Sequence, residues 1–224
     1  MLVGTLALMP ADQAIQRNFQ RSGLQSSGAL RSTATVFGTL GHPGALLIGA
    51  GTYAFGRISN HPTATDIGLH TTEAVLLASG VTEVLKGVAG RERPSDDPTE
   101  PHEFLPFHGF LSHPHSSFPS GHTTAAFAFA TSITEETARY WPHAVRFVAP
   151  AGYGAATLVG LSRIYNNEHW ASDVMMAAAV GTLSGFATVR FMHARPKNRL
   201  NRWLLHAVVV PGARDGTHVG WSLR

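Results

Sequence analysis

The chain of 224 residues has no cysteine and few charged side chains. Without cysteine, a disulfide scaffold, a thiol nucleophile and thiolate metal ligands are excluded. Charged residues make up 14% of the sequence, against ~25% in ordinary soluble domains, and hydrophobic residues make up 44%. This composition excludes an intrinsically disordered chain. It indicates an unusually apolar helical protein or one that contacts a membrane.

The few charges are unevenly distributed. Residues 1–189 contain 10 basic and 13 acidic residues, whereas residues 190–224 contain seven basic residues and one acidic residue. A basic tail of this kind either binds anionic lipid headgroups or forms a solvated extension. No stripe of aromatic residues accompanies the basic ones, so nucleic acid is not expected as a partner. We expect a helical domain over residues 1–193 and a basic tail over residues 194–224.

Helical patterns fill the first 193 residues, and no alternating strand pattern appears before residue 203. The expected helices are a short one from about residue 12 to 21 with Asp12 as N-cap, a helix pair within the 25 uncharged residues between Arg31 and Arg57, and helices over residues 65–90, 120–140, 147–162 and 174–189. The expected fold is an all-α bundle of about six core helices. A short β-hairpin is expected in the tail, from LLHAVVV and THVGWSL.

The relation to a membrane stays open at this level. The apolar segments 147–162 and 174–189 each have 16 residues between charged neighbours, just short of the ~17–25 that a spanning helix needs. Mean hydropathy is only +0.02. The first ten residues, MLVGTLALMP, lack the basic start of a secretory signal.

Three short motifs predict a binding site for an oxyanion. Lys86 lies near the end of one expected helix, and Arg93 lies in the long polar loop 91–119 that follows. Ser120 and Gly121 open the next helix, where unpaired backbone N–H groups and the helix dipole favour an anion. Arg163 ends a later helix and offers a planar fork of donors that matches phosphate oxygens.

Two histidines complete the pattern. His169 and Asp173 are four residues apart, so both are expected on one face in the first turns of the last core helix. A carboxylate bonded to one ring nitrogen fixes the tautomer and leaves the other nitrogen as a nucleophile. His122 follows Ser120 by two residues and is expected on the opposite side of the anion. Together these groups suit phosphoryl transfer.

The spacing K-x6-RP, PSGH and SR-x5-H-x3-D resembles the type 2 phosphatidic acid phosphatase superfamily, which includes acid phosphatases, lipid phosphate phosphatases and vanadium haloperoxidases. All eleven residues of the pattern are present between residues 86 and 173. The resemblance implies that phosphate is bound by five residues: Lys86, Arg93, Ser120, Gly121 and Arg163.

The same resemblance implies the chemistry. His169 would form a phosphohistidine, Asp173 would orient His169, and His122 would protonate the leaving group and then activate water. No metal or other cofactor is implied for the phosphatase members, and vanadate is expected to inhibit. The expected activity is hydrolysis of a phosphomonoester or pyrophosphate, of a lipid or a small molecule, by a membrane-associated or exported protein of the cell envelope.

Several alternatives remain. One is a vanadium-dependent haloperoxidase, although such enzymes are generally much longer; another is a non-catalytic phosphate or lipid binder. His113 and His115 could form a metal site with His122. Four phenylalanines of the loop could line a lipid channel or anchor the loop to the bundle: Phe104, Phe107, Phe110 and Phe118.

Overall fold

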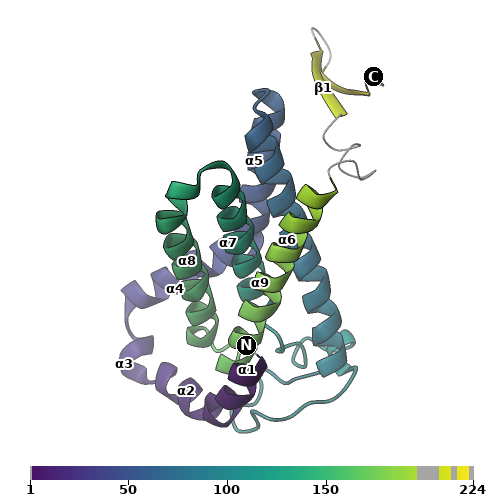
Figure 1. The fold of residues 1–224 in the computed structure, drawn as a ribbon. Coiled ribbons are helices and arrows are strands. Elements are labelled where there is room, and N and C mark those ends of the chain that lie inside the picture. The colour runs from purple at the N-terminus through teal and green to yellow at the C-terminus, as the bar shows by residue number, and fades with distance from the viewer. Residues whose placement is uncertain (1, 196–206, 213–215, 222–224) are drawn as a thin grey trace.

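The structure is a computed structural model that describes residues 2–195, 207–212 and 216–221. Five long helices form a bundle (Figure 1): α5 (Ala45–Ile58), α6 (Pro62–Ala89), α7 (Gly121–Tyr140), α8 (Val145–Tyr165) and α9 (Ala171–Ala194). Helix α7 is central and packs against α6, α8 and α9, while α5 packs against α6. The expected all-α bundle is confirmed.

Shorter helices precede the bundle and gather near one of its ends (Figure 1). They are α1 (Leu2–Leu8), η1 (Met9–Ala11), α2 (Asp12–Phe19), α3 (Ser22–Gln25) and α4 (Gly28–Thr39). Helix α4 packs against α8. The π-helical segment η2 (Leu40–Gly44) joins α4 to α5, with a non-helical backbone at His42. The helix pair expected within residues 31–57 is therefore present.

One detail of the expected N-terminal helix is wrong. Asp12 is not the N-cap of α2, because Ala11 occupies that position without a side-chain cap. The Asp12 side chain is fully buried and accepts hydrogen bonds from Arg91 and Ser172. An acidic residue before a helix usually caps it, but here a buried arginine competes for the carboxylate.

The ends of α6 and α7 follow from local chemistry. Pro62 stands at the first position of α6, where its missing N–H costs nothing, and Gly90 ends the helix with a left-handed φ of 59°. Helix α7 begins after Ser120 and ends before Trp141 and Pro142. Between them, the loop 91–119 contains only the short helix η3 (His108–Phe110). Another short helix, η4 (Pro142–Ala144), leads into α8.

Within the part of the chain that the structure describes, two helices are long and apolar enough to span a membrane, namely α9 and α8 with its preceding turn. The sequence estimate of 16 residues each was too short, since α8 has 21 residues and α9 has 24. The helices continue past Arg163 and begin before Asp173, whose charges interrupt the apolar segments. Only 17% of the apolar window of α8 is buried, so this helix presents an uncovered apolar surface.

A two-stranded antiparallel hairpin follows the bundle in sequence. Strand β1 (Ala207–Gly212) pairs with β2 (Gly216–Trp221), with Ala207 opposite Trp221. They overlap the expected segments at residues 207–210 and 217–221, and the other residues of those segments lie outside the described ones. The basic residues of the tail beyond Arg195 lie outside the described residues.

Glycine lets α9 approach α7 closely. A Cβ atom on Gly181 would lie 2.4 Å from the carbonyl oxygen of Thr124, and one on Gly185 would lie 2.8 Å from that of Ala128. Small residues at such crossings allow backbones to pack directly against each other. The apolar chain therefore builds its core from close backbone packing.

Gly181→Ala should destabilise the fold, because the new methyl group meets the backbone of α7. We expect a loss of about 1–3 kcal/mol, as for other overpacked cores, measured by thermal unfolding in detergent. Gly154→Ala on α8 is the matched control, since a Cβ there meets nothing within 4 Å. Equal stability of the two variants would contradict this packing.

Candidate active site

All eight predicted site residues lie at one end of the bundle, where the loop 91–119 and the turn 166–170 meet the N-terminal helices (Figure 1). Helix α6 ends near Lys86, α8 ends near Arg163, and α7 and α9 begin there. The chain thus brings two helix C-termini and two helix N-termini to one place. The eight residues are Lys86, Arg93, Ser120, Gly121, His122, Arg163, His169 and Asp173.

His169 is buried with one ring nitrogen held by the backbone. Its Nδ1 lies 2.8 Å from the carbonyl oxygen of Ser117. A carbonyl can only accept, so Nδ1 carries the proton and Nε2 keeps its lone pair. Burial lowers the pKa of His169 to about 4, which leaves the ring neutral and nucleophilic at pH 7.

Asp173 does not hold His169 in the expected way. Its Oδ2 is 3.7 Å from Nδ1 of His169, farther than a hydrogen bond. His169 also precedes α9, which begins at Ala171, so the two residues do not share a helical face. The Ser117 carbonyl takes the place that the sequence assigned to the carboxylate.

The carboxylate of Asp173 instead fastens the loop 91–119 to α9. Its Oδ1 accepts a hydrogen bond of 2.6 Å from Nη1 of Arg91. Its Oδ2 accepts one of 2.6 Å from the hydroxyl of Ser117 and one of 2.9 Å from the backbone N–H of Trp170. Because Ser117 also holds His169, Asp173 positions the histidine through Ser117.

Arg91 and Asp12 extend this buried network. Arg91 is fully buried, and its Nη2 lies 2.8 Å from Oδ2 of Asp12. Asp12 also accepts a hydrogen bond of 2.9 Å from the backbone N–H of Ser172. Sequence reasoning missed both residues, because Arg91 falls in the spacer of K-x6-RP and Asp12 lies 79 positions from it.

Arg93 and Arg163 converge on one anion. The carboxylate of Glu168 forms an ion pair with Nη1 of Arg93, and its other oxygen is 3.7 Å from Nη2 of Arg163. Among the described residues, the buried Nε atoms of both arginines have no hydrogen-bond partner. Glu168 therefore lies between two cations that retain free donors, and a phosphate group can use those donors.

Lys86 lies beside the N-terminus of α7. A Cβ atom on Gly121 would be 3.4 Å from Nζ of Lys86, so glycine leaves the ammonium group close to the first backbone amides. Ser120 is fully buried as the N-cap residue, and its Oγ accepts a hydrogen bond of 3.0 Å from Thr123. A cation and a helix N-terminus at one point favour an anion.

His122 shares a pocket of about 240 Å³ with Arg163 and His42. The rings of His42 and His122 meet edge to face, with centroids 5.8 Å apart. Burial, and then the charge of Arg163, lowers the pKa of His122 to about 3. Sequence reasoning missed His42, because the uncharged stretch around it carries no catalytic pattern.

The loop histidines do not form the metal site considered from sequence. Among the described residues, the groups of three metal-type ligands are Glu92 with Glu103 and His115, and His70 with Glu136 and His193. Neither group includes His113 or His122. The trio of His113, His115 and His122 is therefore not assembled in this structure.

The four loop phenylalanines differ in their contacts and exposure. Phe104 and Phe118 contact each other edge to face, with ring centroids 6.0 Å apart, and Arg91 lies over Phe104. These two rings anchor the loop. Phe107 and Phe110 are 62% and 59% exposed, but the ring of Phe110 also lies against α6, where a Cβ atom on Gly87 would be 2.1 Å from it.

Comparison with known proteins gives the family. Residues 68–197, more than half of the chain, match the PAP2 superfamily. The chain belongs to this superfamily. The match covers all eight predicted site residues, and the resemblance drawn from the sequence motifs is confirmed.

Individual PAP2 proteins resemble this chain either over a short segment or at low sequence identity. Over 70 residues the chain is 50% identical to lipid A 1-phosphatase of Porphyromonas gingivalis, a match that spans 31% of this chain and 15% of the relative. Among solved structures, a transmembrane PAP2-type phosphatidylglycerolphosphate phosphatase from Bacillus subtilis is 24% identical, with a TM-score of 0.57 over 88% of this chain and 94% of that one. Aquifex aeolicus LpxE is 22% identical, with a TM-score of 0.55 over 83% and 94%. The two structures share the fold.

Arg91→Met should destabilise the protein by about 3–5 kcal/mol, because it leaves two buried carboxylates without their cation. Adding Asp12→Asn removes one of those carboxylates, so the double variant should unfold at a higher temperature than Arg91→Met alone. Arg146→Met, at an exposed position, is the control. A double variant less stable than Arg91→Met would show that the two side chains do not form a coupled pair.

Glu168→Gln should tighten binding of phosphate or vanadate by about tenfold, because a charged competitor leaves Arg93 and Arg163. The measurement is the inhibition constant of each anion. Glu83→Gln is the control: Glu83 contacts Lys86 at 3.6 Å but is 71% exposed, so its removal should change the constant by less than about twofold. Weaker anion binding in Glu168→Gln would contradict the competition.

Proposed function

We propose that this protein is a PAP2-type phosphatase that hydrolyses a lipid phosphomonoester or pyrophosphate through a phosphohistidine at His169, without a metal in the chemical step. The observation that carries the proposal is the buried His169 ring, protonated at Nδ1 by its bond to Ser117. Its free Nε2 lies at a site that also gathers Lys86, Arg93 and Arg163.

The substrate phosphate takes the place of the Glu168 carboxylate between Arg93 and Arg163. The unpartnered Nε atoms of both arginines then find acceptors. Lys86 and the first amides of α7 bind the remaining oxygens. These cations neutralise the charge on the equatorial oxygens of the transition state, which is the main requirement for phosphoryl transfer.

In the first step, Nε2 of His169 attacks phosphorus and the bond to the leaving oxygen breaks. His122 gives its proton to that oxygen. Without substrate, burial and the charge of Arg163 lower the pKa of His122 to about 3. A bound phosphate dianion offsets the positive charge around the ring, which raises this pKa and favours the protonated ring. In the second step, neutral His122 accepts a proton from water, the water oxygen attacks phosphorus, and the P–N bond breaks.

The uncovered apolar surfaces support a lipid substrate. Phe107, Phe110 and Leu111 are exposed on the loop beside the site, Leu111 at 83%. Helices α8 and α9 are candidate membrane spans. We infer that the loop enters the lipid headgroup region and that the bundle associates with a membrane of the cell envelope. The named relatives, a lipid A 1-phosphatase and a phosphatidylglycerolphosphate phosphatase, support the same class of substrate.

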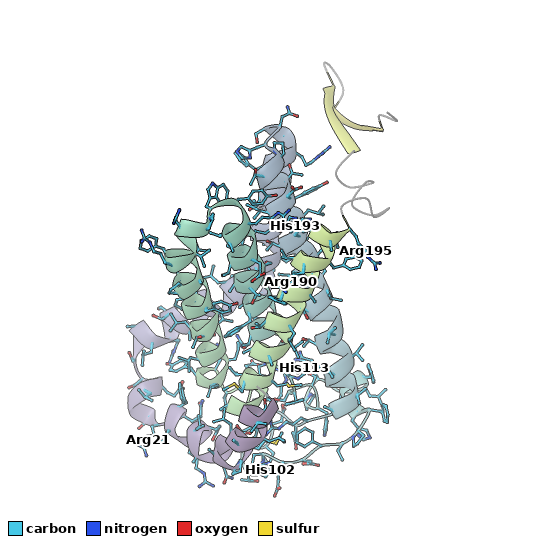
Figure 2. The ribbon with its side chains drawn as sticks, viewed as in Figure 1. Arg21, His102, His113, Arg190, His193 and Arg195 are labelled. Atoms are coloured by element: carbon cyan, nitrogen blue, oxygen red, sulfur yellow. The ribbon has the colours of Figure 1, made fainter. Side chains whose placement is uncertain are left out.

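The distribution of basic residues supports an orientation. The basic tail follows the C-terminus of α9, at the end of that helix opposite His169. Arg190 and Arg195 lie at this far end (Figure 2). Arginine and lysine near a membrane span favour the cytoplasmic side. The active site would then open on the opposite face, outside the cytoplasm.

The test compares two substrates in detergent and in lipid vesicles: a soluble aryl phosphate and a phosphorylated lipid. His169→Ala should reduce turnover of both by a factor on the order of 10³ or more, and a brief treatment with EDTA at 25 °C should leave turnover unchanged. His143→Ala, at an exposed position, is the control. Undiminished turnover in His169→Ala would refute the proposal.

A variant of the loop 91–119 distinguishes contact with the lipid from hydrolysis of the phosphate. Leu111→Ser should raise KM for the vesicle substrate and leave turnover of the aryl phosphate unchanged. Equal effects on both substrates would contradict the role of the loop in lipid contact while leaving the chemistry at His169 in place.

A further inference from the structure

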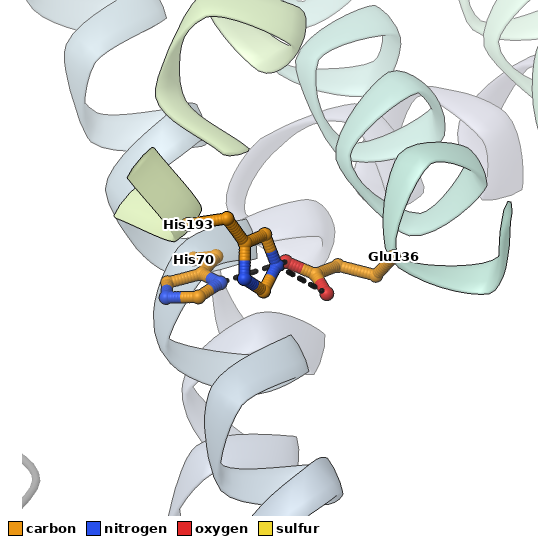
Figure 3. Close-up of side chains that lie close together, drawn as sticks. All are labelled: His70, Glu136 and His193. Atoms are coloured by element: carbon orange, nitrogen blue, oxygen red, sulfur yellow. Dashed lines mark hydrogen bonds and ion pairs between the residues drawn. The ribbon is translucent and has the colours of Figure 1, made fainter. Parts of the chain in front are cut away.

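A second buried polar cluster lies in the bundle, formed by His70 of α6, Glu136 of α7 and His193 of α9 (Figure 3). Nδ1 of His70 is 2.7 Å from Oε1 of Glu136. Nε2 of His193 is 3.0 and 3.1 Å from the two oxygens of the same carboxylate. Three helices thus direct two imidazole nitrogens and one carboxylate to a single point.

This cluster is remote from the active site. His193 and Asp173 are 20 positions apart on α9, which corresponds to about 30 Å along a helix. His70 and Lys86 are 16 positions apart on α6, or about 24 Å. Figure 2 shows His193 near the C-terminal end of α9, and His102 of the active-site loop at the other end of the bundle. The phosphatase mechanism uses no residue of the cluster.

No lysine or arginine of the described residues forms an ion pair with the carboxylate of Glu136. Glu136 is fully buried, and within the described part of the chain its hydrogen-bond and ion-pair partners are the two histidines. Glu73 lies one helical turn after His70, and both of its carboxylate oxygens are buried without a hydrogen-bond partner. Two carboxylates removed from water in an apolar bundle favour a bound cation.

We propose that His70, Glu136 and His193 bind a divalent transition-metal ion of the zinc class, which ties α6, α7 and α9 together. Two imidazoles and one carboxylate are ligands that zinc accepts, whereas calcium and magnesium favour oxygen alone. The ligand atoms all lie within 4.8 Å of one another. Tetrahedral ligands at ~2.1 Å from zinc are about 3.4 Å apart, so small side-chain movements admit the ion.

Binding of the metal needs no redox chemistry and releases no proton, because each imidazole only changes its tautomer. Both histidines now donate to Glu136, so Nδ1 of His70 and Nε2 of His193 carry hydrogens. On binding, each ring moves its proton to its other nitrogen and presents a lone pair to the ion. The charge of Glu136 then offsets half of the ionic charge. Burial raises the pKa of Glu73, and the nearby His70 acts against that rise; a bound cation would favour the ionised Glu73 in the same way.

The test is titration of the untagged full chain, stripped with EDTA in detergent, with Co²⁺ as a spectroscopic probe and Zn²⁺ as competitor. Wild-type protein should bind one Co²⁺ with the visible absorption of a four- or five-coordinate ion, which Zn²⁺ displaces. Binding should also raise the unfolding temperature. Removal of the metal should lower that temperature and leave turnover at 25 °C unchanged, so the result is independent of the proposed function.

Single variants assign the ligands. His193→Ala, at the most exposed ligand, and Glu136→Gln should each weaken Co²⁺ binding by about 100-fold or more, since even outer partners of metal ligands contribute 10- to 100-fold. His115→Ala, in the other group of metal-type ligands, and His122→Ala, in the active site, should bind as wild type does. No Co²⁺ absorption in wild type, or binding unchanged in His193→Ala, would overturn the proposal and leave the cluster as a hydrogen-bonded clamp between helices.

Discussion

A carboxylate withdrawn from water needs donors on its lone pairs, and Asp173 obtains them from several separate segments. Arg91 and Ser117 come from the loop 91–119, and the amide of Trp170 comes from the turn before α9. Asp12 pairs with the same arginine and brings in the N-terminal helices. Removing one partner of such a buried ion pair lowers the free energy of unfolding strongly, because the other charge stays buried without a partner. The intact pair stabilises the fold much less when it is compared with apolar side chains of similar size. The network therefore fixes the geometry around the nucleophile.

The rest of the bundle is suited to concentrating charge at this end. Close packing through Gly181 and other small residues excludes water between the helices. Along α8 and α9 few charges are present, and several of the cations in the chain meet near Arg93 and Arg163. Interactions between those cations and a phosphate are stronger in such a partly buried site than in water. The protein therefore has few charged residues overall and a high density of positive charge at this end of the bundle.

The sequence predicted those parts of the site whose residues recur at fixed spacing, and the helix ends near Gly90 and before Pro142, while it placed the start of α6 three residues after Pro62. It could not predict Asp12 and Arg91, because contacts between residues 79 positions apart leave no local pattern. It also placed Asp173 directly on His169, since spacing alone cannot show that a backbone carbonyl is nearer. The lengths of α8 and α9 were underestimated because charged residues lie near both ends of each helix: Arg146 and Arg163 in α8, and Asp173 and Arg190 in α9.

The central claim is that Nε2 of His169 becomes covalently phosphorylated. The most direct test is rapid quenching of the protein during turnover of a ³²P-labelled substrate, followed by mapping of the labelled peptide. We predict an acid-labile, base-stable phosphoramidate on His169, which is absent in His169→Ala. With an aryl phosphate, whose leaving group needs little protonation, it should accumulate in His122→Ala because water activation is slowed. Label on a different residue, or turnover without any labelled protein in the His122 variant, would contradict the account.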